Sequence, residues 1–116
     1  MEIKIVKDSI NKKELIDITR GQFGNLVKAA VDIEQEIMAV GGEMHADEEV
    51  ALMEQENSKR EHTWCINLYP EKSGEELIEF DSINNIKPFY DNRSRDVENP
   101  KTKEEIKVIV NKLVVE

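Results

Sequence analysis

The sequence has few aromatic residues, one cysteine and no long apolar run, and each shortage excludes a class of function. Aromatic side chains make up 5% of the 116 residues, too few for a platform on which nucleic-acid bases stack. The single cysteine, Cys65, excludes an internal disulfide and a zinc site made of thiolates. No stretch approaches the ~20 apolar residues of a membrane-spanning helix, so we expect no membrane partner.

Basic residues are absent between Ala29 and Ser58, a segment that holds nine acidic residues: Asp32, Glu34, Glu36, Glu43, Asp47, Glu48, Glu49, Glu54 and Glu56. The net charge of −9 therefore falls in this acidic segment, and the rest of the chain is neutral. Such a segment is typical of a solvated face that keeps a protein soluble. It also suits a surface that meets a basic protein partner. An acidic chain argues against binding of duplex nucleic acid, which requires a basic face.

The length predicts one domain over residues 1–116. The first six residues, Met1–Val6, lack the charged-then-apolar order of a secretory signal and predict a first strand instead. Because the single thiol also has no internal partner, we expect a cytoplasmic protein.

Both ends of the chain carry the signals of a helix. Asn11 and Glu14 have the spacing of a capping box, in which each side chain bonds the backbone of the other residue. Near the other end, Asn99 precedes Pro100, and proline suits the first turn of a helix. Apolar residues then follow at spacings of three and four: Ile106, Ile109, Val110, Leu113 and Val114. This stripe predicts a helix that buries one face.

Residues 63–69 and 77–82 alternate between apolar and polar side chains, which predicts an antiparallel hairpin. Trp64, Ile66 and Leu68 would lie on one face of the first strand. The apolar run of the second strand continues to Ile86, so the predicted strand extends over residues 77–86.

Residues 26–40 fit two structures. A helix would bury Leu26, Ala30, Ile33, Ile37 and Val40 on one side. A hairpin would turn near Gln35 and Glu36. One face of its first strand would then hold four apolar residues: Val27, Ala29, Val31 and Ile33. Periodicity alone slightly favours the helix.

Four polar blocks resemble successive blocks of a small prokaryotic family of unknown function: Gly41–Glu49, Asn67–Pro70, Glu79–Ser82 and Asn92–Arg95. The likeness extends over nearly the whole chain, including both end helices. It implies one compact α+β domain and no particular activity. In that family a glycine is often found near position 36, where this chain has Glu36. A glycine there suits a hairpin turn, so the resemblance favours the hairpin for residues 26–40.

His45 is the first candidate for chemistry. If residues 43–49 are extended, Glu43, His45, Asp47 and Glu49 point to one side, and if they form a helix, His45, Glu48 and Glu49 share a face. His45 and Asp47 are candidates for acid–base catalysis. Together with Glu49 they carry a weak signal for a divalent metal, because a structural zinc site usually needs four ligands. A purely structural hydrogen bond from His45 to a carboxylate fits the same pattern.

Arg93 and Arg95 lie in a long loop from Pro88 to Asn99, and long loops often bind ligands. Guanidinium groups bind phosphates and carboxylates in a planar fork. Glu79 and Asp81, on the preceding strand, are internal partners for them. The two arginines and two carboxylates therefore indicate one of two structures. They form either a salt-bridge network that holds the loop against the sheet or a binding site for a small anion. Cys65, with no base beside it in the sequence, is expected to be a buried structural residue.

These patterns predict an α+β fold, with an antiparallel sheet and the N- and C-terminal helices packed on one face. The favoured function is a small cytoplasmic binding or regulatory protein whose acidic surface meets a basic partner. The alternative is an enzyme, or a protein that binds a small anion or a metal, with a polar site built from the His45 and Arg93 segments. Convergence of the candidate residues on one concavity would favour the alternative. We expect no cofactor, and a homo-oligomer is compatible with the sequence.

Overall fold

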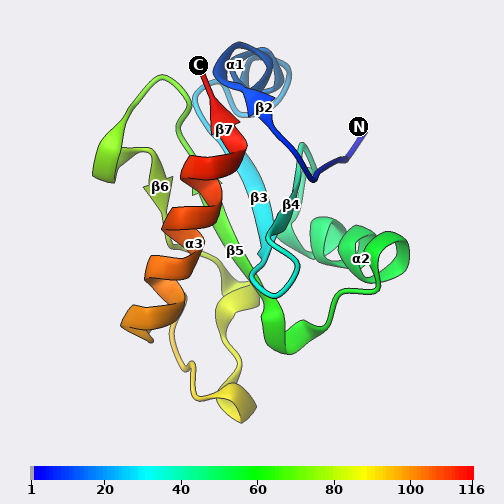
Figure 1. Cartoon of the computed structure of the whole chain (residues 1–116), viewed down its shortest axis with the longest axis vertical. Coiled ribbons are helices and arrows are strands. Elements are labelled where there is room, and N and C mark those ends of the chain that lie inside the picture. Colours follow the sequence, from blue (N-terminus) through cyan, green and yellow to red (C-terminus); the bar gives the residue numbers. More distant parts are fainter. Residues whose placement is uncertain (1) are drawn as a thin grey trace.

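The computed structural model describes residues 2–116 and shows a five-stranded antiparallel sheet with helices on both faces (Figure 1). Across the sheet the strands are ordered β1 (Lys4–Val6), β4 (Ile37–Val40), β3 (Val27–Asp32), β5 (Thr63–Leu68) and β6 (Ile78–Glu79). A separate parallel pair joins β2 (Ile10–Asn11) to β7 (Val114–Val115). The helices are α1 (Lys12–Gly21), α2 (His45–Glu56) and α3 (Pro100–Leu113). The predicted α+β class is confirmed, while Met1, part of the predicted first strand, lies outside the described residues.

Both predicted helix starts are present. Asn11 caps α1, because its Oδ1 accepts the backbone N–H of Glu14 at 2.8 Å. Asn99 caps α3 by accepting the N–H groups of Lys101 and Thr102 at 2.9 and 3.4 Å. Within residues 2–116, no helix is long and apolar enough to cross a membrane.

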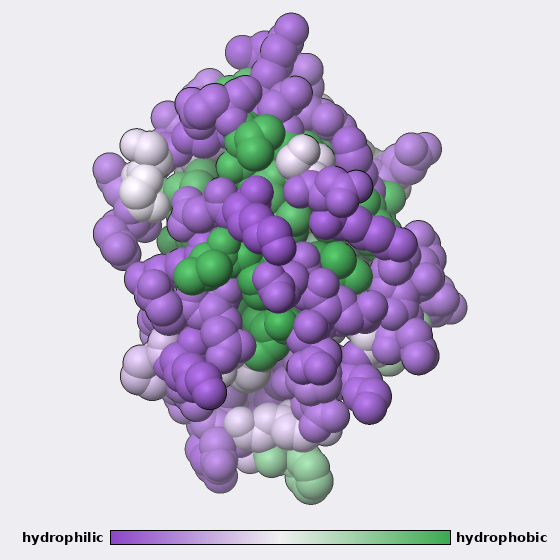
Figure 2. Space-filling model, in the orientation of Figure 1, coloured by the Kyte–Doolittle hydropathy of each residue, from purple (hydrophilic) through white to green (hydrophobic). Residues whose placement is uncertain are grey.

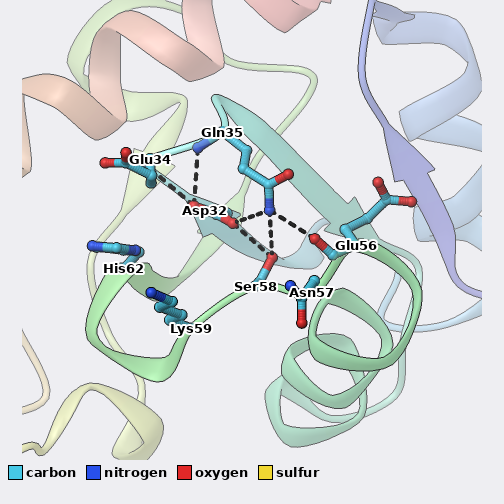
Figure 3. A pocket seen from close by; sticks show the side chains of 8 residues that line it. All are labelled: Asp32, Glu34, Gln35, Glu56, Asn57, Ser58, Lys59 and His62. Carbon is cyan, nitrogen blue, oxygen red and sulfur yellow. Dashed lines mark hydrogen bonds between the residues drawn. The ribbon is translucent and has the colours of Figure 1, made fainter.

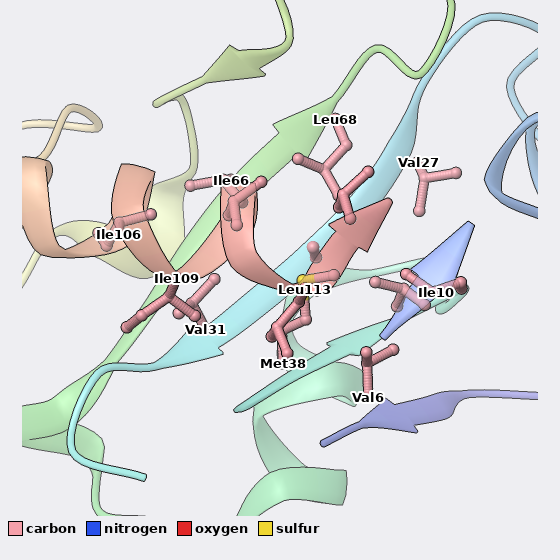
Figure 4. Close-up of a cluster of buried hydrophobic side chains, with 14 of the residues drawn as sticks. Val6, Ile10, Val27, Val31, Met38, Ile66, Leu68, Ile106, Ile109 and Leu113 are labelled. Atoms are coloured by element: carbon pink, nitrogen blue, oxygen red, sulfur yellow. The ribbon is translucent and has the colours of Figure 1, made fainter. Parts of the chain in front are cut away.

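Helices α1 and α3 cover one face of the sheet, as predicted. The stripe of α3 is buried against the strands, with Ile109 3% exposed and Ile106 and Leu113 fully buried. Figure 4 shows these three side chains gathered with Val31 of β3 and Ile66 of β5. Trp64, Ile66 and Leu68 all belong to this cluster, so the predicted alternation of β5 is confirmed.

Helix α2 covers the opposite face and was not predicted over its full length. Its Leu52 packs against small strand residues, among them Ala30, Ala39 and Cys65. The short side chains on this face let the helix lie close to the sheet. In Figure 1, α2 therefore lies apart from α1 and α3, with the sheet between them.

Residues 26–40 form the hairpin of β3 and β4, so the helical alternative is wrong. The turn places Glu36 in the left-handed region, with φ of 57°, a conformation that glycine adopts most readily. The carboxylate of Asp32 stabilises the turn, since its Oδ1 accepts the N–H groups of Glu34 and Gln35 at 2.9 and 3.1 Å.

The hairpin of β5 and β6 is present, but the second strand ends at Glu79 and not at Ile86. The hydroxyl of Ser82 accepts the N–H of Asn84 at 3.1 Å and starts a 3₁₀ turn over Ile83–Asn85. The side chain of Asn85 then takes the place of a strand residue. It accepts the N–H of Cys65 at 2.8 Å and donates to the Cys65 carbonyl at 2.9 Å.

The surface on the side of α3 is largely hydrophilic, with hydrophobic residues gathered in its middle (Figure 2). Val108 of α3 is 57% exposed, in contrast to its buried neighbour Ile109. The polar groups that could bind a ligand gather elsewhere, around the start of α2.

Candidate functional site

The chain enters α2 through two glycines whose positions exclude a larger residue. Gly41 has φ of 93°, and a Cβ atom on it would lie 3.1 Å from the carbonyl oxygen of Glu2. A Cβ on Gly42 would lie 2.8 Å from Cγ of Glu48. After this close approach, His45, Glu48 and Glu49 share the helix face that is buried on the sheet. The helical alternative for residues 43–49 is therefore the one that forms.

Both ring nitrogens of His45 are engaged. Nε2 lies 2.8 Å from the carbonyl oxygen of Ile66, and Nδ1 lies 2.9 Å from the hydroxyl of Ser82. A carbonyl only accepts, so Nε2 carries the proton and Nδ1 accepts the Ser82 hydroxyl. Burial lowers the pKa of His45, against the effect of the Ile66 carbonyl, and the positive charge of Lys28 lowers it further. The imidazole is therefore neutral at pH 7.

His45 and Ser82 line an open groove of about 490 Å³ beside the N-terminus of α2. Apolar side chains and polar side chains both contribute to its walls. The lining residues are Phe23, Leu26, Lys28, Met44, His45, Asn67, Asp81, Ser82, Ile83, Asn84 and Arg95. They come from the loop after α1, from β3 and β5, from α2, and from the chain that follows β6. A mixed apolar and polar lining is what small-molecule sites have in common.

Arg95 reaches one wall of the groove and pairs with Asp81, with Nε 2.5 Å from Oδ1. This is one of the pairings predicted for the loop, and both side chains are about half exposed. Glu79 lies beside it, because Asn67 donates to Glu79 Oε1 at 2.9 Å and to the Asp81 carbonyl at 3.3 Å. The structure thus brings together three residues of the predicted polar site: His45, Asp81 and Arg95.

The other candidates lie outside the groove. Asp47 is exposed on the first turn of α2. Arg93 is exposed, and its guanidinium pairs with Asp91, with Nη1 3.7 Å from Oδ1. Glu49 is buried in a network in which Arg60, Thr63 and Asn84 all donate to it, at 2.9–3.3 Å. The proposed metal set of His45, Asp47 and Glu49 is therefore not assembled, and the described part of the chain has no cluster of such side chains able to hold a metal ion.

Burial raises the pKa values of two side chains on the α2 side of the sheet. Burial raises the pKa of Glu48 well above its ordinary value of 4.5, and its Oε2 accepts the Gly42 N–H at 2.9 Å. Burial likewise raises the pKa of the Cys65 thiol, which is 0% exposed. Cys65 is thus a buried structural residue, as expected, and not an activated nucleophile.

A second concavity lies beside the turn of the β3–β4 hairpin, and Figure 3 shows its lining residues around Asp32. The buried carboxylate of Asp32 accepts the Ser58 hydroxyl at 2.6 Å and the Gln35 side-chain amide at 2.9 Å. The same amide donates to the carbonyl of Glu56 at 2.9 Å. With its oxygens occupied in this way, Asp32 ties the hairpin to the end of α2, and this concavity is structural.

The acidic segment does not form one continuous charged surface. Asp32, Glu48 and Glu49 are buried, and Glu56 and Glu36 form salt bridges with lysines. The carboxylates that remain exposed, with no salt bridge to any described residue, are Glu34, Glu43, Asp47 and Glu54.

Sequence reasoning did not identify Lys28 and Ser82 as site residues. In β3, Lys28 is followed directly by three small or apolar residues, Ala29, Ala30 and Val31, and this is the local signal that it faces a special environment. Ser82 lacks any motif of a nucleophilic serine. Its importance arises only because the fold places it beside His45, 37 residues away in the sequence.

The sequence comparisons agree with the resemblance noted above. A family model described as "Protein of unknown function (DUF5674)" matches residues 4–113, so the chain belongs to that family. No curated protein and no solved structure matches it.

Proposed function

We propose that this member of the family binds a small anionic molecule in the groove between α2 and the chain that follows β6. The observation that carries the proposal is the convergence of Lys28, His45, Asp81, Ser82 and Arg95 on one concavity. Scattered positions for these residues would have favoured a purely structural role.

The charge of the groove supports an anionic ligand. Lys28 forms no salt bridge with any residue from 2 to 116, and its ammonium lies 5.0 Å from the centre of the Phe23 ring. Arg95 adds a second positive charge, partly balanced by Asp81. Since His45 is neutral at pH 7, Lys28 is the cation of the groove with no carboxylate partner among the described residues, and a carboxylate or phosphate would complete it.

The apolar part of the lining supports a ligand larger than an inorganic ion. Phe23 and Met44 are 43% and 59% exposed, and Ile83 is 66% exposed. These side chains lie on the same groove as the polar groups. An organic anion with an apolar portion would remove them from water while its charged end meets Lys28.

Two predictions from the sequence remain proposals. A cytoplasmic location is supported by the single cysteine, which leaves no internal disulfide. A basic protein partner stays a separate prediction, for which the four exposed carboxylates named above are the available contacts.

The test measures the free energy of unfolding of the protein in the presence of several small anions. Acetate, benzoate and inorganic phosphate are compared with chloride at matched ionic strength. We expect benzoate to stabilise the wild type most, because it adds apolar contact to a carboxylate, and a ligand at 100 times its Kd adds about 2.7 kcal/mol.

Lys28→Gln and Arg95→Gln should weaken this stabilisation. Arg93→Gln is the matched control, since it removes an exposed guanidinium of the same loop that does not line the groove. Equal responses to all four anions, or an unchanged benzoate response in Lys28→Gln, would contradict the proposal.

A further inference from the structure

The pair formed by Ser82 and His45 has the geometry of a nucleophile and its general base. The Ser82 hydroxyl donates to Nδ1 of His45 at 2.9 Å, and the Ile66 carbonyl holds Nε2 on the opposite side of the ring at 2.8 Å. A serine within hydrogen-bond reach of a base, which is itself oriented by a third group, is the arrangement that activates a hydroxyl. Here a backbone carbonyl takes the part of the orienting group.

Three further observations fit this arrangement. His45 is neutral at pH 7, so Nδ1 has a free lone pair to take the hydroxyl proton. Ser82 and His45 both line the groove although they are only 2% and 8% exposed, which places the pair at its inner wall. Lys28 and Arg95 line the same groove and make its walls positively charged, and positive charge near a reacting acyl group stabilises the negative charge that develops on it.

We propose that Ser82 is an acyl-accepting nucleophile, with His45 as its base, acting on small esters that carry an anionic group. This inference rests on the proposed binding function, because it uses the same groove and the same cations.

The reaction is balanced with water as the only co-reactant. Ser82 Oγ bonds to the carbonyl carbon while its proton moves to His45 Nδ1. The bond from that carbon to the leaving alcohol oxygen then breaks, and the oxygen takes the proton from Nδ1. Water next transfers a proton to Nδ1 and attacks the acyl carbon, and Ser82 Oγ leaves and recovers the proton. The net reaction converts an ester and water into an acid and an alcohol.

The test uses the full chain and a small alkyl fluorophosphonate. Attack by Ser82 Oγ forms an O–P bond and breaks the P–F bond, so intact mass increases by one phosphonyl group. We expect a single adduct that peptide mapping places on Ser82 of the wild type. This mapping needs no variant and so does not depend on whether Ser82→Ala folds.

Variants and pH then test the role of His45. In His45→Gln, the amide can still donate to the Ile66 carbonyl, but no base faces Ser82, and we expect labelling at least ~10-fold slower. Burial lowers the pKa of His45, so the wild-type rate should fall only at a pH below the ordinary histidine value of 6.5, where protonation removes the lone pair. Ser94→Ala, in the adjacent loop, is the control and should label at the wild-type rate.

Three results would overturn the proposal: no adduct, an adduct at another residue, or a labelling rate that is unaffected by both pH and His45→Gln. Labelling also separates this inference from the binding function. If benzoate stabilises the protein and Ser82 remains unlabelled, binding stands and acyl transfer is excluded. If neither occurs, both are excluded.

Discussion

Glu48 lies directly against the Cα of Gly42 and accepts its backbone N–H with Oε2 at 2.9 Å. The contact joins the start of α2 to the end of β4, and it exists because Gly42 has no side chain. Glu48 is 0% exposed, so any shift of its side chain must take place within the packed interior.

Gly42→Ala should therefore destabilise the protein by about 1–3 kcal/mol, the usual effect of overpacking a filled interior. Gly21→Ala is the matched control, because no atom lies within 4 Å of its added Cβ and Gly21 is helical. That change should be neutral or stabilising. Urea unfolding of both variants measures the difference, and equal stabilities would show that Glu48 can repack.

Glu48→Gln should make the protein more stable near pH 7. Burial raises the pKa of Glu48 in the folded state, so its stabilising contribution is complete below 4.5 and is lost as the pH rises toward the folded pKa. The loss is at most ~1.4 kcal/mol per pH unit, and the uncharged amide avoids it. Between pH 4 and pH 8, the unfolding free energy of Glu48→Gln should exceed that of the wild type by an amount that grows as the pH rises. Glu43→Gln changes an exposed residue, and its unfolding free energy should follow that of the wild type.

Lys87 should give the opposite dependence at higher pH. Its ammonium is buried 4.0 Å from the centre of the Trp64 ring and donates to the carbonyls of Arg60 and Thr63. Burial lowers the pKa of Lys87 from 10.5 to about 8. The folded state thus gains stability as the pH rises from about 8 to 10.5, and the gain is lost as the pH falls through about 8.

In Lys87→Met this gain should be absent. The wild-type minus variant difference in unfolding free energy should grow by up to ~1 kcal/mol per pH unit above pH 8. Both proteins should carry Cys65→Ala, because the Cys65 thiol titrates in the opposite sense and interacts electrostatically with Lys87. A constant difference would mean that Lys87 titrates normally.

Ile109→Ala should cost about 2–5 kcal/mol, because its side chain is 3% exposed within the main core. Val108→Ala changes the neighbouring residue, which is 57% exposed, and should stay within about 0.5 kcal/mol of the wild type. Chemical denaturation of the pair tests whether α3 is part of the cooperative core. A loss below about 1 kcal/mol for Ile109→Ala would make α3 peripheral.

Arg95→Gln should leave the fold nearly intact, with a loss of about 0–1 kcal/mol, because the Arg95–Asp81 pair is half exposed. This makes it a usable variant for the test with small anions. A loss of several kcal/mol would show that the pair pins the loop and that its role is structural.

Much of the fold was predictable where local signals and burial agree. The sequence predicts Asn11 and Asn99 as helix caps, and both cap a helix in the structure. The apolar stripe of α3 predicts its buried face, because that face packs against an apolar core. Helix α2 gave no such signal, since its buried face includes His45, Glu48 and Glu49 beside Leu52. A periodicity of apolar residues cannot reveal a helix whose buried side chains are held by hydrogen bonds.

The candidate site was predictable only in part, for a related reason. His45, Asp81 and Arg95 were recognised by residue type, and Arg95 with Asp81 by their order along the chain. Ser82 and Lys28 were missed, because their role depends on neighbours that only the folded sheet supplies. The end of β6 was mispredicted because the side chain of Asn85, and not a backbone segment, pairs with Cys65.

That pairing by Asn85 has a consequence for how the molecule behaves in a crowded solution. Strand β6 pairs only with Asn67 and Leu68, at the end of β5. Without another partner, the backbone N–H and carbonyl groups on this edge of β5 before Asn67 would have no hydrogen bonds. Asn85 occupies the N–H and carbonyl of Cys65, and the ammonium of Lys87 occupies the carbonyl of Thr63. An exposed strand edge is a template on which another chain can add and aggregate. Two polar side chains thus close this edge to intermolecular β-pairing without the need for a longer strand.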